Sequence, residues 1–201
     1  HDALADVHAT IAIARLVRER QPRLFDYYFN LRIKRNVQQQ IDLHNHEILL
    51  HASGMYPAEL GSIAPMLPLV KHPTNSNGIV VYDLRHDPAT LLEQDSETIR
   101  RLLYTKRDEL QEGEERPPLK TLHINKSPAV APVATLTEEA ASHWQIDLQQ
   151  AEAFRQRLLS ETGLVARLEE VFSETHGVES PRDADMALYG GFLQDADRKL
   201  C

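Results

Sequence analysis

The sequence predicts an α+β fold in which helices flank a small, mostly β module. Apolar residues recur at helical spacing near the N-terminus. The middle of the chain instead holds short apolar runs separated by Gly, Pro and Asn, a pattern typical of strands and turns. Helical patterns return from about Thr137. We therefore expect the 201 residues to form helices, a β module and further helices, in that order.

The N-terminal part is expected to form two helices. The first covers residues 2–21, with Asp2 placed to cap its start, and it ends at Pro22 because proline lacks the N–H that a helix interior needs. Its helically spaced apolar residues are Leu4, Val7, Ile11, Ala14 and Leu16. The second covers about residues 23–41. Its predicted buried stripe is Leu24, Tyr27, Tyr28, Leu31 and Val37.

The β module follows, and four apolar segments in it are predicted to be strands. They are residues 47–53, 63–71, 78–84 and 119–125. Between the last two we expect a helix in one or two pieces over residues 88–105, and then an exposed loop over residues 106–118. A segment punctuated by prolines, residues 127–132, follows the fourth strand.

The C-terminal part is expected to be helical in two or three pieces from about Thr137, with an interruption at Gly163. Residues 175–181 then link to a last element over residues 183–200. Because the chain opens on His1 and shows no cap signal at its end, we expect an internal fragment of a longer protein.

The composition excludes several classes of protein. No apolar run approaches the roughly 18 residues of a membrane-spanning helix, and no signal peptide is visible. The single cysteine, Cys201, cannot form an internal disulfide, so we expect a reducing compartment and a cytoplasmic protein. The net charge of −8, from 22 Lys and Arg against 30 Asp and Glu, argues against a simple DNA-coating protein.

A first candidate for chemistry is the pair His1 and Asp6 at the start of the first helix. A carboxylate one turn into a helix can face a metal ion, and a nearby histidine suits general-base work because its ordinary pKa is near 6.5. On the spacing alone, the favoured interpretation is a helix whose acidic residues, Asp2 and Asp6, lie near the positive end of its dipole. Both interpretations stay open at this point.

A second candidate is a basic, aromatic segment over residues 15–36, with a net charge of +5 that leaves −13 for the rest. Its cations include Arg15 and Arg23, and its aromatic residues are Phe25, Tyr27, Tyr28 and Phe29. Such residues can stack on single-stranded bases beside neutralised phosphates. The alternative is an amphipathic helix with a cationic face in solvent and an aromatic stripe in the core.

A third group is His44, His46 and His51, of which the first two would share one face of a strand, as zinc ligands can. No cysteine lies near them in the sequence, and the neighbouring acids are Asp42 and Glu47. A surface or strand-edge location is the favoured interpretation.

Together these segments resemble one family closely. Residues 1–7, followed by Ala9 and Thr10, are similar to the third active-site motif of the bacterial exodeoxyribonuclease I family, which are DEDDh-type nucleases. The similarity continues through 53–56, 72–75, 123–126 and 188–192, so it spans nearly the whole chain. Residues 1–7 and 123–126 are its most specific parts.

The resemblance implies an enzyme that degrades single-stranded DNA from the 3′ end to mononucleotides, in DNA repair and recombination, with two Mg²⁺ ions. Asp6 matches the metal-binding aspartate, an oxygen ligand of the type that Mg²⁺ prefers, and His1 matches the general base. The expected DNA-binding residues are Arg15, Arg23, Tyr27 and Lys126.

The resemblance also implies the architecture and the partners. Residues 1–21 would be the last helix of the nuclease domain, residues 22–174 an SH3-like β-barrel module with added helices, and residues 175–201 the start of a C-terminal helical domain. Besides single-stranded DNA, the implied partner of a monomeric enzyme is the acidic C-terminal tail of single-stranded-DNA-binding protein. Several of the basic residues that relatives carry near that tail are replaced here, by Glu47, Pro132 or Leu159.

Two other functions remain as alternatives. A non-catalytic module that holds DNA or a protein tail would suit a chain without the other carboxylates of the metal site. A DEDDh relative that acts on RNA would share the motif at His1 and Asp6.

Overall fold

The computed structural model describes residues 3–173. The helices are α1 (Ala3–Arg20), α2 (Pro22–Asn30), α3 (Lys34–Gln40), α4 (Ala89–Glu93), α5 (Ser96–Tyr104), α6 (Glu138–His143), α7 (Leu148–Ser160) and α8 (Leu164–Ser173). The strands are β1 (Leu49–Ala52), β2 (Ile63–Lys71), β3 (Gly78–Asp83), β4 (Leu119–His123) and β5 (Ala129–Pro132). Short 3₁₀ turns cover Ala58–Leu60, Arg107–Glu109 and Val133–Thr135. The elements predicted over residues 175–201 lie outside the described residues, as do His1 and Asp2.

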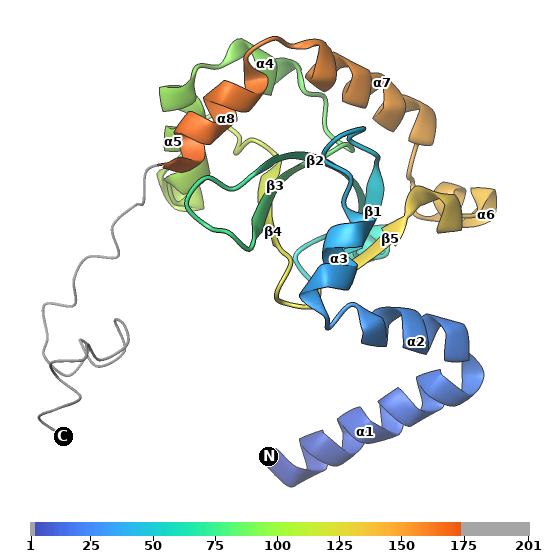
Figure 1. Cartoon of the computed structure of the whole chain (residues 1–201). Helices are drawn as coiled ribbons and strands as arrows, with labels where there is room; N and C mark the ends of the chain where they lie inside the picture. Colours follow the sequence, from blue (N-terminus) through green and yellow to red (C-terminus); the bar gives the residue numbers. More distant parts are fainter. Residues whose placement is uncertain (1–2, 174–201) are drawn as a thin grey trace, which may run out of the picture.

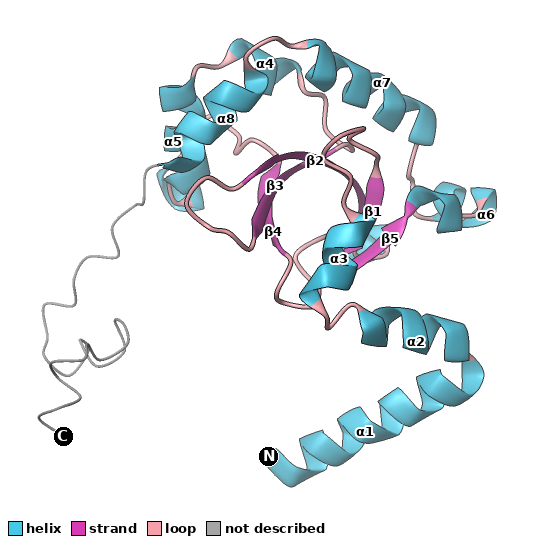
Figure 2. Ribbon diagram, viewed as in Figure 1, coloured by secondary structure: helices cyan, strands magenta, loops and turns pink. Residues whose placement is uncertain are grey.

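The strands form one five-stranded antiparallel sheet in the order β4-β3-β2-β1-β5 (Figure 1). Met66 in β2 lies opposite both Leu49 in β1 and Asp83 in β3. The sheet is strongly curved, as Figure 2 shows, but β4 and β5 stand at the two ends of the order. The expected barrel is therefore an open, curved sheet, which is still consistent with an SH3-like module.

Two apolar cores lie on opposite sides of β3. Every residue of β3 is buried, so its side chains, which alternate between the faces, serve both cores. The first core joins the sheet to α5, α7 and α8, and includes Leu67, Val80, Tyr82, Ile99, Leu158 and Leu168. The second core joins the sheet to the α2–α3 segment, and includes Leu31, Val37, Leu49, Met66, Val81 and Leu122. Burial on both faces explains why the strand is apolar from Gly78 to Tyr82, before the buried Asp83 at its end.

Most predicted elements are confirmed, and the differences have physical reasons. The strand predicted over residues 63–71 is observed with the same bounds, and the helix over residues 88–105 forms in two pieces. The proline-punctuated segment 127–132 contains a strand that we did not predict, because proline cannot donate to a sheet ladder. β5 is an edge strand, where the missing N–H of Pro132 costs little.

The predicted second helix is wrong in one respect, because it divides into α2 and α3 around residues 31–33. Of its predicted buried stripe, Leu31 and Val37 are buried, whereas Leu24 and Tyr28 are exposed. The large apolar residues of the predicted stripe of α1 (Leu4, Val7, Ile11 and Leu16) are likewise exposed, and no residue of α1 is buried in the described chain. Helical spacing thus located the helical segments, but it predicted neither the break between α2 and α3 nor which residues are buried.

Gly61, in the connection before β2, packs tightly against Trp144 at the end of helix α6. Gly61 has φ +69°, and a Cβ built there would lie 2.5 Å from Cδ2 of Trp144. We expect Gly61→Ala to lower the free energy of unfolding by about 2–3 kcal/mol, since it adds backbone strain and a clash with a ring. Urea denaturation measures this.

Gly113 provides the matched control, because its φ is +85° but no atom lies within 4 Å of the added Cβ. Gly113→Ala should cost only the strain, about 1 kcal/mol. Equal losses in the two variants would show that the Trp144 contact contributes nothing.

Candidate nucleic-acid interface

The predicted catalytic pair is only half within the described residues. His1 lies outside them, whereas Asp6 lies exposed in the first turn of α1. The carbonyl oxygen of Asp6 accepts a 2.8 Å hydrogen bond from the Thr10 hydroxyl, which leaves the carboxylate uninvolved in that contact. In the part of the chain that the structure describes, no group of three His, Cys, Asp or Glu side chains could hold a metal ion. Asp6 fits Mg²⁺ by ligand type, but within the described residues it does not belong to a group of three such ligands.

The histidine group does not form a zinc site. His44 and His46 lie in a turn rather than on a strand, and His51 is buried in β1. The Nδ1 atom of His46 lies 2.7 Å from the carbonyl oxygen of Pro68, so this ring is used in tertiary packing. The favoured surface interpretation holds for His44, which is exposed, whereas His51 belongs to the interior.

The basic, aromatic segment forms an exposed patch on α1, α2 and the residues after them. The Phe25 and Phe29 rings stack with centroids 5.6 Å apart. The Arg32 guanidinium lies 3.7 Å from the centroid of Phe29, and that of Arg18 lies 5.9 Å from Phe25. We call Arg18, Phe25, Phe29 and Arg32 the cation–aromatic patch. Phe29 is 51% exposed even though Arg32 and Phe25 contact its ring.

The predicted DNA-binding residues are distributed over two regions. Arg15 on α1 and Arg23 on α2 are both exposed and belong to the two helices that carry the patch. Tyr27 is half-buried, and its hydroxyl lies 3.0 Å from the carbonyl oxygen of Val130 and 3.2 Å from Oε1 of Gln40. Tyr27 therefore ties α2 to α3 and β5, and burial raises the pKa of its hydroxyl. Its role toward DNA stays a prediction.

Lys126 lies in the other region, an exposed turn after β4. This turn adjoins the loop between β2 and β3, because Ile124 N donates to the Asn77 carbonyl at 2.9 Å. The Lys34 ammonium donates to Oδ1 of Asn77 at 2.6 Å, and Nδ2 of Asn75 lies 3.5 Å from Nδ1 of His123. The structure thus joins segments 72–75 and 123–126, which are far apart in sequence. Sequence analysis identified both segments but not their contact.

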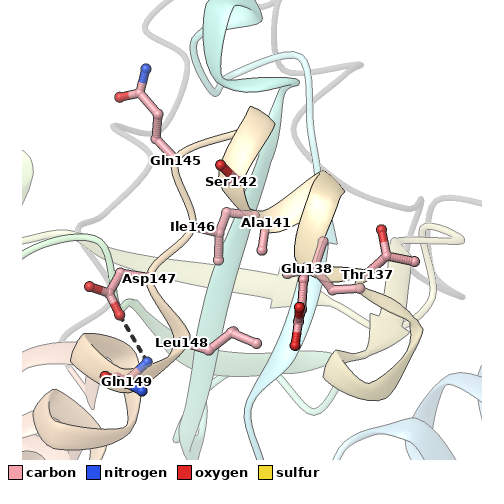
Figure 3. A pocket seen from close by; sticks show the side chains of 10 residues that line it. Thr137, Glu138, Ala141, Ser142, Gln145, Ile146, Asp147, Leu148 and Gln149 are labelled. Atoms are coloured by element: carbon pink, nitrogen blue, oxygen red, sulfur yellow. Dashed lines mark hydrogen bonds between the residues drawn. The ribbon is translucent and has the colours of Figure 1, made fainter.

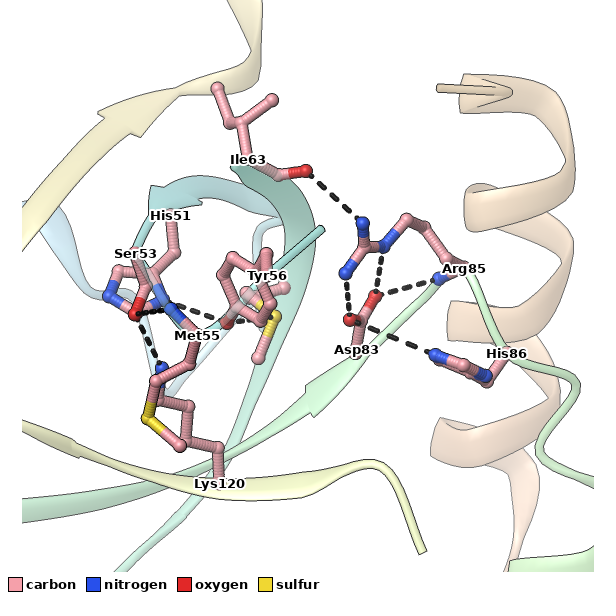
Figure 4. A network of polar contacts seen from close by, with 10 residues as sticks. His51, Ser53, Met55, Tyr56, Ile63, Asp83, Arg85, His86 and Lys120 are labelled. Carbon is pink, nitrogen blue, oxygen red and sulfur yellow. Dashed lines mark hydrogen bonds and ion pairs between the residues drawn. The ribbon is translucent and has the colours of Figure 1, made fainter. Parts of the chain in front are cut away.

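A polar network occupies the opposite end of β3 and β4, and sequence analysis missed it (Figure 4). The buried Asp83 carboxylate accepts from Nη2 of Arg85 at 2.6 Å and from its Nε at 3.1 Å. The Tyr56 hydroxyl lies 2.9 Å from Nδ1 of His51, and the Lys120 ammonium donates to Oγ of Ser53 at 3.2 Å. The only sequence signals were polar residues inside apolar strands, which are individually weak.

His51 makes folding sensitive to pH. Burial, followed by the nearby Lys120 charge, lowers the pKa of His51 to about 4. The unfolded chain binds this proton near the ordinary value of 6.5, so lowering the pH from about 6.5 to about 4 favours unfolding. We expect the urea midpoint to fall across this range, and to fall less in His51→Gln. The control is the exposed His44, and His44→Gln should keep the same dependence of the urea midpoint on pH as the wild-type chain. The same dependence on pH in all three proteins would contradict the assignment to His51.

A pocket with an acidic lining lies between α6 and α7 (Figure 3). It measures about 680 Å³, and its charged lining residues are Glu138 and Asp147. Asp147 also caps α7 by accepting from the backbone N–H groups of Gln149 and Gln150. An acidic lining repels phosphate, so this pocket is not part of a nucleic-acid interface.

No helix within residues 3–173 has both the length and the apolar character needed to cross a membrane.

Comparison with known proteins supports the resemblance inferred above. Exodeoxyribonuclease I of Haemophilus influenzae is 39% identical over 199 residues, which cover 98% of this chain and 42% of the relative. The structure of E. coli exonuclease I in complex with a 5cy-dT13 oligonucleotide is 40% identical, with a TM-score of 0.88 over 100% of this chain and 42% of that chain.

A zinc ion bound form of the E. coli ExoI–ssDNA complex is also similar, at 40% identity with a TM-score of 0.87, over 99% of this chain and 42% of that one. The chain therefore spans less than half the length of these relatives. Residues 32–174 match the family described as the Exonuclease I SH3-like domain. Since this match covers most of the sequence, the chain belongs to the exonuclease I SH3-like domain family.

Proposed function

We propose that this chain is part of a Mg²⁺-dependent exonuclease that hydrolyses single-stranded DNA from the 3′ end to mononucleotides, in DNA repair and recombination. The observation that carries the proposal is the 40% identity over the whole chain to an exonuclease I solved with a dT13 oligonucleotide. We further propose the division into a nuclease-domain helix (1–21), an SH3-like module with added helices (22–174) and the start of a C-terminal helical domain (175–201).

The proposed chemistry assigns His1 as the base that takes a proton from the attacking water and Asp6 as a metal ligand. Two bound Mg²⁺ ions would activate that water and stabilise the departing oxygen. Asp6 points from an exposed helix turn, so ligands from outside the described residues have access to it. The family similarity to a zinc-bound complex supports a metal-dependent reaction.

DNA binding is proposed for two surfaces. On α1 and α2, Arg15 and Arg23 would neutralise phosphates while Phe29 stacks on a base. On the β module, Lys126 lies in an exposed turn beside the loop that holds Asn77, and Lys34 of α3 donates to Oδ1 of Asn77. The excess of positive charge in residues 15–36 supports this assignment in a chain that is acidic as a whole.

The direct test is nuclease activity of the full-length gene product on an oligonucleotide labelled at either end. We expect Mg²⁺-dependent release of labelled mononucleotide at once from a 3′ label and only late from a 5′ label. An RNA oligonucleotide of the same sequence should neither be degraded nor compete. Release from the 5′ label first, or activity that survives EDTA, would contradict the proposal.

The cation–aromatic patch gives a separate binding prediction. Phe29→Ala should weaken binding of a dT oligonucleotide by about tenfold, since stacking of one base contributes roughly 1–3 kcal/mol. Fluorescence anisotropy in EDTA measures it without hydrolysis. Val165 on α8 is similarly exposed at 46%, so Val165→Ala is the control and should leave affinity unchanged. Unchanged affinity of Phe29→Ala would remove this patch from the interface.

A second candidate is a non-catalytic module that holds DNA. It is favoured by one observation, that the described residues contain no group of three His, Cys, Asp or Glu side chains that could hold a metal ion. DNA binding without any Mg²⁺-dependent hydrolysis by the full-length gene product would establish it. For the enzyme, we propose a cytoplasmic monomer whose protein partner is the acidic tail of single-stranded-DNA-binding protein, on the family resemblance.

A further inference from the structure

A cationic pocket lies at the end of the sheet where β3 ends and β4 begins, away from the turn of Lys126. It measures about 500 Å³, within the range of roughly 300–1,000 Å³ that is usual for small-molecule sites. Its cations are Arg85, Arg107, Arg116 and Lys120, and apolar atoms of Met55 and Tyr56 also line it. Met55 is 83% exposed, so the apolar part of the lining is open to a ligand.

The charges in this pocket are not balanced. Asp83 is the acidic residue of the lining, and it is committed to Arg85 through the 2.6 Å ion pair. In the described chain, Arg107, Arg116 and Lys120 have no carboxylate oxygen within 4.0 Å. Three cations around one hollow concentrate positive potential there, although the whole chain is acidic.

The Lys120 ammonium has hydrogen-bond donors that an anion could accept from. Its ammonium carries three donors, of which one reaches Oγ of Ser53 at 3.2 Å, and it lies 4.7 Å from the centroid of the Tyr56 ring. Partial burial lowers the pKa of Lys120, and the nearby Asp83 charge only partly offsets this effect. Arg116 lines the pocket and donates from one Nη atom to the Thr105 carbonyl.

We propose that this pocket binds a nucleoside 5′-monophosphate, with the phosphate between Lys120, Arg107 and Arg116 and the nucleoside against Met55. A phosphomonoester carries a charge of about −1.5 to −2 at neutral pH, which matches three unpaired cations better than a phosphodiester does. The choice of nucleotide rests on the proposed function, since mononucleotides are the product of that reaction. The bound nucleotide is thus held apart from α1 and its Asp6.

Isothermal titration calorimetry of the chain in EDTA tests this directly. dTMP should bind saturably, and thymidine, which lacks the phosphate, should not. Lys120→Gln should weaken dTMP binding by about tenfold, since a charge-assisted hydrogen bond contributes roughly 1.5–3 kcal/mol. Arg107→Gln, at an exposed position, should weaken it by about threefold. Lys71→Gln, an exposed lysine at the far end of β2, should leave it unchanged.

Three results would overturn the proposal. They are no saturable binding of dTMP, equal affinity in the wild-type chain and both pocket variants, and binding of a 5′-phosphorylated dT oligonucleotide but not of dTMP. Arg107→Gln keeps the test valid if circular dichroism shows that Lys120→Gln unfolds. EDTA prevents hydrolysis, so the calorimetry measures nucleotide binding alone. If the nuclease proposal fails, that failure is seen in the activity assay and does not affect the binding result.

Discussion

Replacing His1 by alanine in the full-length gene product is expected to lower the rate of mononucleotide release by about 10²–10⁴-fold, the usual contribution of a general base. The reason is that water is a weak nucleophile until its proton is removed, and the imidazole would take that proton near neutral pH. Affinity for single-stranded DNA should change little, since the base acts in the chemical step. Single-turnover kinetics with a 3′-labelled oligonucleotide separates the two effects.

His8 provides the matched control. It is exposed on α1, seven residues after the predicted base in the sequence, and has no proposed role in the reaction. His8→Ala should retain the wild-type rate. A His1→Ala protein with an unchanged rate would disprove the base assignment, whereas equal losses in both variants would point to damage to α1 rather than to the chemistry.

Removing the carboxylate of Asp83 should give the largest loss of stability. Asp83→Asn leaves the Arg85 guanidinium, whose side chain is 14% exposed, without its anionic partner. Breaking a buried ion pair by removal of one member costs about 3–5 kcal/mol, because the remaining charge is not solvated. Urea denaturation should therefore show a clearly lower midpoint with an unchanged slope.

The control is another aspartate that pairs with an arginine, but at the surface. Asp87 accepts from Arg157 at 2.8 Å, and both side chains are about half exposed, at 58% and 46%. Asp87→Asn should cost less than about 1 kcal/mol, since water screens an exposed pair. Equal costs for the two variants would show that burial does not strengthen the Asp83–Arg85 interaction.

Local sequence patterns predicted most secondary structure because they depend on neighbouring residues. The apolar run 63–71 and the turn after it were sufficient for β2. The same reasoning missed β5, since pairing with β1 outweighs the proline of this segment only at a sheet edge. It also grouped α2 and α3 into one helix, because no proline or glycine marks the break at residues 31–33.

The candidate site was predictable only in part. The cations and aromatic residues of the 15–36 segment are visible in the sequence. The stacking of Phe25 on Phe29 and the contact of the Arg32 guanidinium with the Phe29 ring are not. Tyr27 looked like its neighbours, and only the contact with Val130 shows that its hydroxyl joins α2 to β5.

The sequence by itself determined that a β module lies between helical segments, the positive segment at residues 15–36 and the family resemblance, since these depend on composition and short spacings. Only the tertiary structure decided which polar residues meet. The strand register brings His51, Asp83 and Lys120 to one end of the sheet and His123 to the other. The physical reason is that burial and charge pairing depend on contacts between residues that are far apart in the sequence. Local sequence patterns do not specify the distances between such residues.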